Sequence, residues 1–301
     1  MYNITRGAVK SHPFRTILLI TWLTLVFSMP DSFQIISDYF AFLFIGITGA
    51  IFANSTGAGG GVVFVPFFNQ LKIDNSAIIA TSFAIQCCGM TAGAITWHKY
   101  RLQLKTENGK EHSQWQFLNR GLAITVPFSI FGILVAQFLL GSYTVQAQTS
   151  LHLGFGIFSI LLAIAIYASI PLLSRTKVTL SFVKTDFVIL SALAFFGGII
   201  TAWLSVGVGE LVAVYLILRG FNIACSIALA VILSAFSVWS AIYYHLTVSH
   251  AIYWEVLLFA GAGAIVGGII AKRVVLYFPV IKLKVFFATW VLIMGIAGLF
   301  T

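Results

Sequence analysis

The residues best suited to chemistry form a polar, glycine-rich stretch between two apolar segments. It reads Asn54-Ser55-Thr56-Gly57-Ala58-Gly59-Gly60-Gly61. Glycine inside a helix costs about 1 kcal/mol, but it lets a backbone turn sharply or approach a ligand closely. Ser55 and Thr56 favour the N-cap of a helix that begins near Gly57. Because the first N–H groups of a helix lack partners and carry partial positive charge, the stretch predicts an anion site.

A second copy of this pattern lies 150 positions further along, as Ser205-Val206-Gly207-Val208-Gly209-Glu210. The alternative for both copies is close helix packing through small residues. A polar-capped glycine run that occurs twice favours the binding interpretation over packing alone.

Three polar residues, Thr81, Ser82 and Gln86, lie within one apolar segment. Ser82 and Gln86 share a helix face at i, i+4. Hydroxyl and amide donors suit a tetrahedral oxyanion and avoid burying a full cation. Interhelical hydrogen bonding is an equally good interpretation.

Glu210 is the one acid well inside an apolar stretch, and an ionisable group there is costly and suggests function. We expect it to couple proton movement to anion movement, because a charged carboxylate beside an anion site would repel the substrate. The alternatives are an ion pair with Arg219 or a cap on the helix that starts at Gly207.

The candidate site follows from these three groups of residues. The predicted substrate-binding residues are Asn54, Ser55, Thr56, Gly57, Gly59, Gly60, Gly61, Thr81, Ser82, Gln86, Ser205, Gly207 and Gly209, and Glu210 is the candidate for proton coupling.

The composition places these residues in a membrane protein. Apolar residues make up 60% of the 301 positions and charged residues only 8%, against about 25% in soluble domains. This excludes a soluble enzyme domain and a disordered chain, and long apolar runs argue against a transmembrane barrel. The net charge of +9 comes from Lys and Arg in short loops, which indicates a lipid bilayer with its positive-inside rule and no nucleic acid.

The chain divides into eleven apolar segments. They are 14–29, 36–54, 57–71, 76–97, 121–140, 150–173, 186–205, 207–218, 224–245, 254–271 and 283–300. A span needs about 20 residues. Segments 57–71 and 207–218 are short and follow their predecessors almost directly, so we expect broken helices or hairpins that turn within the membrane.

Basic loops set the predicted orientation, with a cytoplasmic N-terminus. Loops 98–120 and 272–283 are expected inside, and loops 141–149 and 246–253, which lack Lys and Arg, outside. Corresponding loops of the two copies thus fall on opposite sides, as in the inverted repeats of secondary transporters. The predicted units are an N-terminal extension with one extra span at 1–35, a first repeat at 36–175 and an inverted second repeat at 184–301.

Here the chain resembles a family. Gly57-Ala58-Gly59-Gly60-Gly61 with Val65-Pro66, and then Ala80-Thr81-Ser82-Phe83, resemble the first repeat signature of the TauE/SafE sulfite-exporter family. Gly207-Val208-Gly209-Glu210 resembles its second copy, over a match of about 36–300. The second copy departs from the first, with Leu216 in place of a proline and Ala228-Leu229 in place of Thr81-Ser82.

The resemblance implies a carrier of sulfite, organosulfonates or related small sulfur anions in a bacterial inner membrane. The predicted protein is therefore an all-α polytopic secondary transporter with a small anionic substrate. An anion channel, a carrier of another small organic anion and a membrane-embedded enzyme are the alternatives. No catalytic motif, metal-ligand spacing or cofactor is expected, and a homo-oligomer is left open.

Overall fold

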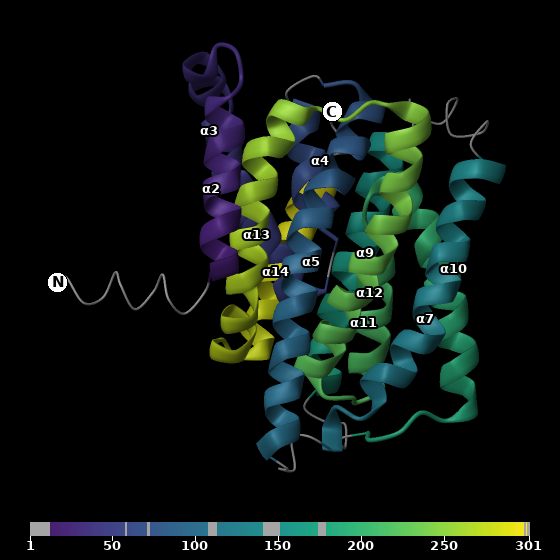
Figure 1. Cartoon of the computed structure of the whole chain (residues 1–301). Helices are drawn as coiled ribbons and strands as arrows, with labels where there is room; N and C mark the ends of the chain where they lie inside the picture. Colours follow the sequence, from purple (N-terminus) through teal and green to yellow (C-terminus); the bar gives the residue numbers. More distant parts are fainter. Residues whose placement is uncertain are drawn as a thin grey trace.

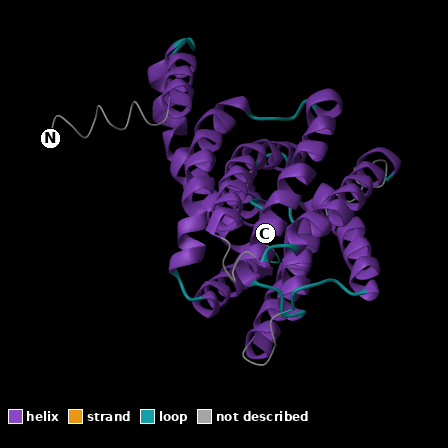
Figure 2. Ribbon diagram, turned by 60° about the horizontal axis from the view of Figure 1, so that its bottom comes forward, coloured by secondary structure: helices purple, strands orange, loops and turns teal. Residues whose placement is uncertain are grey.

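The computed structural model describes residues 13–57, 59–70, 73–107, 113–140, 151–173, 179–297 and 299. Within these residues the chain forms helices and connecting turns, without strands (Figure 2). The helices are α2 (Pro13–Phe27), α3 (Ser32–Thr56), α4 (Gly61–Gln70), α5 (Asn75–Glu107), α7 (Phe117–Leu134), α9 (Leu151–Leu173), α10 (Lys184–Leu204), α11 (Val208–Leu218), α12 (Ile223–Tyr244), α13 (Trp254–Tyr277) and α14 (Val280–Ala297), with π-helical turns η1 (Val135–Leu139) and η3 (His245–Ser249). The all-α prediction is confirmed.

Six of the described helices are long and apolar enough to cross a membrane: α3, α5, α7 with η1, α10, α12 with η3, and α13. Helices suit a bilayer because they satisfy their backbone hydrogen bonds internally. The chain is thus a multi-pass membrane protein. The predicted cytoplasmic N-terminus at 1–12 and the predicted outer loop 141–149 lie outside the described residues.

Two sequence-based boundaries are wrong. Residues 98–107, expected in a connecting loop, continue helix α5 as far as Glu107. The inner loop expected at 272–283 is shorter, because α13 continues to Tyr277 and α14 begins at Val280. Lys284, which was grouped with the basic residues of that loop, lies within α14 and is only 9% exposed. In both places polar residues were interpreted as a loop, although a helix tolerates them where it leaves the membrane or faces the protein interior.

Helices α3 and α4 form one hairpin, and α10 and α11 form another. Helix α4 has 10 residues and α11 has 11. A helix rises about 1.5 Å per residue, and the hydrocarbon core of a bilayer is about 30 Å thick. Each of these helices is therefore long enough to cross only half of the core. The hairpins enter the bundle from opposite ends, and their tips meet near its middle (Figure 1). The two short segments therefore turn back inside the membrane.

Helices of the first half pair with helices of the second half. Helix α3 packs against α13 and α10 against α7, while α5 packs against α12 and α9 against α14. Exchanging the halves converts the first pair into the second and leaves the other two pairs unchanged. An inverted duplication would produce this pattern, and the inversion and the units 36–175 and 184–301 stay predictions.

Glycines let α3 and α13 approach to backbone contact. A Cβ atom at Gly46 would lie 2.0 Å from the carbonyl oxygen of Ala260, and one at Gly263 would lie 2.0 Å from that of Leu43. In lipid, such close contact through small residues is a main source of helix association. Helix α2 lies at the edge of the bundle (Figure 1), where Trp22 Nε1 donates a hydrogen bond to α13.

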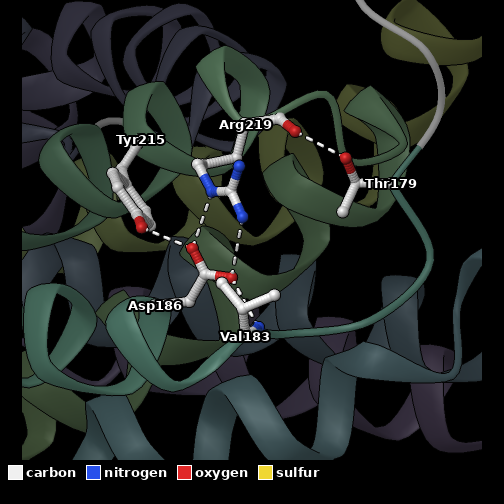
Figure 3. A network of polar contacts seen from close by, with 5 residues as sticks. All are labelled: Thr179, Val183, Asp186, Tyr215 and Arg219. Carbon is white, nitrogen blue, oxygen red and sulfur yellow. Dashed lines mark hydrogen bonds and ion pairs between the residues drawn. The ribbon is translucent and has the colours of Figure 1, made fainter.

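An ion pair closes the base of the α10–α11 hairpin (Figure 3). Asp186 is fully buried. Its carboxylate accepts from Arg219 Nε at 2.7 Å, Arg219 Nη2 at 3.1 Å, the Tyr215 hydroxyl at 2.5 Å and Val183 N at 2.8 Å. The hydrogen bond to Asp186 raises the pKa of Arg219. The Thr179 hydroxyl donates to the Arg219 carbonyl oxygen at 2.6 Å, which fastens the preceding loop to the same point.

The α3–α13 contact predicts that Gly46→Ala destabilises the protein. The added methyl group would overlap the carbonyl of Ala260, and overpacking costs about 1–3 kcal/mol. We expect a lower thermal unfolding midpoint for the purified protein in detergent. Gly154→Ala is the matched control, because its Cβ would meet nothing closer than 3.9 Å. Equal midpoints for the two variants would contradict this packing.

The ion pair predicts that Arg219→Gln destabilises the protein by about 1–3 kcal/mol, because a buried carboxylate loses its cation but keeps two other donors. Thermal unfolding in detergent measures the effect. Arg120→Gln removes the same charge from an exposed position and is the control. An unfolding midpoint for Arg219→Gln that equals that of the control would show that the pair contributes nothing.

Candidate functional site

Unusual backbone conformations form the two hairpin tips. After α3, Gly57 has φ +81°, and after α10, Ser205 has φ +60° and Gly207 has φ +145°. A positive φ is readily adopted by glycine and costs other residues energy. These turns reverse the chain within a few residues, so α4 and α11 begin next to one another in the middle of the bundle.

Glycines also let the tips touch. A Cβ atom at Gly61 would lie 2.3 Å from the carbonyl oxygen of Ser205, and one at Gly209 would lie 2.1 Å from that of Gly57. A larger residue at either position would push the hairpins apart. Close packing therefore occurs at these glycines. The helix start expected near Gly57 is wrong, because Gly57 ends α3 and α4 begins only at Gly61. Ser55 and Thr56 lie in the last turn of α3 and do not cap α4.

The carboxylate of Glu210 bridges the two tips. Its Oε1 accepts from Gly59 N at 2.8 Å and its Oε2 from Gly207 N at 2.9 Å. The side chain is 2% exposed. Glu210 thus caps α11, as one sequence alternative proposed, and reaches the other hairpin as well. The other alternative, a pair with Arg219, is wrong, because Arg219 binds Asp186.

Gln86 of α5 holds both tips from the side. Its Oε1 accepts from Gly60 N at 2.8 Å. Its Nε2 lies 2.7 Å from Ser205 Oγ and 3.1 Å from the Ser205 carbonyl oxygen. Ser82, one turn earlier, lies 3.1 Å from Gln86 Nε2 and 3.0 Å from Ser205 Oγ. The interhelical hydrogen bonds expected for this face are therefore present, and they join α5 to the candidate site.

The residues at the tips enclose a small cavity, which we call the tip cavity. Its walls include Gly59, Gln86, Glu210, Ser234 and Ser237. The volume is about 10 Å³, which is room for about one water molecule. Ser234 Oγ is buried and has no hydrogen-bond partner. The tip cavity is thus closed and polar, and it has an unused hydroxyl group.

The remaining predicted residues divide into two groups. Ser55 and Thr56 line a second cavity, which Glu210 also lines. Asn54 and Thr81 line neither of these two cavities. Asn54 donates to backbone carbonyls of α3 and α5, and Thr81 accepts from Tyr253 N at 3.0 Å and so holds the loop before α13. Both make packing contacts between elements.

Four further residues belong to the two cavities and were missed in the sequence. Thr201, Ser234 and Ser237 line the tip cavity, and Thr201 Oγ1 accepts from Val208 N at 2.9 Å. Lys284 lines the second cavity. The available signal was a hydroxyl residue in an apolar helix, which is too common to be specific, since α10 and α12 each contain several. Lys284 was interpreted together with the neighbouring basic loop residues.

The electrostatics of the tips favour an anion. Helices α4 and α11 both begin here, and a helix start carries about half a positive charge. Backbone N–H, hydroxyl and amide groups surround the same point, and the Glu210 carboxylate supplies the compensating negative charge. Among the described residues, no group of His, Cys, Asp and Glu could hold a metal ion. The arrangement can bind a small oxyanion.

Comparison with known proteins agrees with this architecture. A family model described as sulfite exporter TauE/SafE matches residues 41–298. Neither the curated proteins nor the solved structures contain a match. The matched region begins within α3 and leaves α2 outside, and it includes both hairpins. The chain belongs to the sulfite exporter TauE/SafE family of membrane transporters.

Proposed function

We propose that the protein is a secondary transporter that moves small sulfur-containing anions, such as sulfite or organosulfonates, across the bacterial inner membrane by alternating access. One observation carries the proposal: the Glu210 carboxylate accepts an N–H group from each hairpin tip. The central position is thus shaped for an anion whose oxygens bridge two helix starts. The family assignment supports sulfite and its relatives as the substrate class.

The substrate takes the place of the carboxylate in this proposal. A sulfite or sulfonate group presents several oxygens around one sulfur atom, so two of them can accept from Gly59 N and Gly207 N. Ser234 Oγ and the Gln86 side chain lie on the walls of the same cavity and can donate to a further oxygen. A tip cavity of about 10 Å³ is too small for this anion unless Glu210 moves aside.

Proton coupling follows from the same competition. A charged Glu210 and an anionic substrate would repel each other at a site with little water, where charges interact strongly. A protonated Glu210 no longer competes for both N–H groups and leaves the anion as the only negative charge. Proton and anion then bind together and move in the same direction. The carboxylate returns to the tips after both have left.

The closed site supports a carrier over a channel. A channel needs a continuous path, whereas here the tips touch at Gly61 and Gly209 and enclose only the small tip cavity. The two hairpins open toward opposite ends of the bundle (Figure 1). Movement of one hairpin and its packed helices relative to the other would expose the central position to one side at a time.

The central site predicts that Gly59→Leu abolishes saturable anion flux. The added side chain would begin 3.0 Å from Gln86 Oε1 and 3.1 Å from the Ser205 carbonyl oxygen, so it would fill the position of the anion. Purified protein in liposomes is tested with sulfite, a small sulfonate and chloride. Gly154→Leu, on an exposed part of α9, is the control. Absence of sulfur-anion flux with well-folded wild-type protein would refute the proposed function.

The coupling proposal predicts that Glu210→Gln loses the response to a pH gradient. With wild-type protein, a permanently charged sulfonate should accumulate on the alkaline side, because protons carry it there. The amide cannot take up a proton, so the variant should only equilibrate the sulfonate. Glu255→Gln, at the start of α13, controls for loss of one acid. Accumulation by Glu210→Gln equal to that of wild type would rule out coupling through this residue.

A further inference from the structure

A second cavity connects the hairpin tips with a buried lysine. It lies among α3, α9, α11, α12 and α14, and we call it the lateral cavity. Ser55 and Glu210 line it near the tips, and Lys284 of α14 also lines it. Ile217 and Ile223, on either side of the turn between α11 and α12, line it as well. The lateral cavity therefore extends from the tips toward the end of the bundle at which α11 ends.

We propose that the lateral cavity is a second anion-binding site, in which Lys284 and Ser55 hold the sulfur oxyanion on its way between the tips and that end of the bundle. The inference rests on the proposed function for the identity of the anion. It adds to the central site a second binding position for the anion, which Lys284 and Ser55 form and which anions reach from one side of the membrane.

The charge of Lys284 is the first argument. Its side chain is 9% exposed, whereas that of Lys282 on the same helix is exposed. A lysine at such a position is costly and usually serves an ion or substrate path. Glu210 lines the same cavity, so an anion held by Lys284 is close to the carboxylate that it must displace.

The hydroxyl group of Ser55 is the second argument. Ser55 is 4% exposed, and its Oγ has no hydrogen-bond partner. Buried hydroxyl groups almost always have a partner, so an unpartnered one facing a cavity indicates a ligand or a water molecule. Together with Lys284 it gives the lateral cavity two donors of the kinds that bind an oxyanion.

Size and walls fit a small anion. The volume is about 40 Å³, room for roughly three water molecules and comparable with a group of four heavy atoms. Much of the wall is apolar and includes Ile166, Ala213 and Ile227. Apolar walls weaken solvent screening, so the attraction between Lys284 and an anion is stronger than at an exposed surface.

The site exists on one side only. Helix α9, which pairs with α14, contains neither Lys nor Arg. In addition, α5 and α11 end and α10 begins at the same end of the bundle (Figure 1). The last turns of α5 contain Arg101, α10 begins at Lys184, and Arg219 follows α11, so the positive-inside rule assigns this end to the cytoplasm. The lateral cavity should thus strengthen the binding of anions that arrive from the cytoplasmic side. It should not change the binding of anions that arrive from the other side.

Thiol labelling tests the cavity without any transport. In membrane vesicles of both orientations, Ile217→Cys is treated with an anionic and a cationic methanethiosulfonate of similar size, with wild-type protein as the background for the native cysteines. We expect reaction from the cytoplasmic side only, with the anionic reagent faster by about tenfold. Lys284→Gln should remove this preference. Lys282→Gln, an exposed lysine on the same helix, should keep it. An unchanged preference in Lys284→Gln, or no reaction from the cytoplasmic side, would overturn the site.

Flux kinetics in oriented liposomes provide the second measurement. With Lys284→Gln, the KM for a small sulfonate offered on the cytoplasmic side should rise about tenfold, while the KM on the other side stays the same. Lys284→Arg should restore the KM, which excludes a mere folding defect. If wild-type protein transports the sulfonate and Lys284→Gln leaves the KM unchanged, the anion site in the lateral cavity is overturned, whereas the proposed function is not. Charge-selective labelling without any sulfur-anion flux would refute the proposed function and leave the anion site standing.

Discussion

The Glu210 carboxylate accepts a hydrogen bond from each hairpin tip and so joins the two hairpins at the centre of the bundle. Two helices begin face to face in an apolar bundle, and each presents N–H groups that have no partner within its own helix. Their partial positive charges would repel, and unsatisfied N–H groups are costly where water is scarce. One carboxylate, accepting from Gly59 N and Gly207 N, satisfies a donor on each side and joins the two halves.

The surrounding helices serve to hold the tips at contact distance. Helix α5 contributes Gln86, which contacts Gly60 of one hairpin and Ser205 of the other. Glycines remove side chains where backbones meet, both at the tips and between α3 and α13. In a bilayer the hydrophobic effect does not drive helices together, so helix association depends on such backbone contacts and on interhelical hydrogen bonds. The site and the packing therefore use the same residues.

The two hairpins differ in how firmly they are held. The α10–α11 hairpin has the buried ion pair of Asp186 with Arg219 at its base and carries Glu210 at its tip. The described part of the α3–α4 hairpin shows no ion pair of this kind. The ion pair joins the two arms of the α10–α11 hairpin to each other, so this hairpin is the more firmly held of the two.

Hydropathy and glycine runs are local properties, so the all-α membrane fold, the two short re-entrant segments and the glycine tips could be predicted from them. Glu210 could be identified in the same way, since an acid in an apolar stretch is visible without a structure. The contacts of Glu210 could not, because Gly59 lies 151 positions away and is brought near by folding. The same holds for Lys284 and Ser234, whose importance depends on which cavity they line, and for Thr81, which packs against a distant loop. Contacts between remote segments arise from packing, which no local pattern encodes.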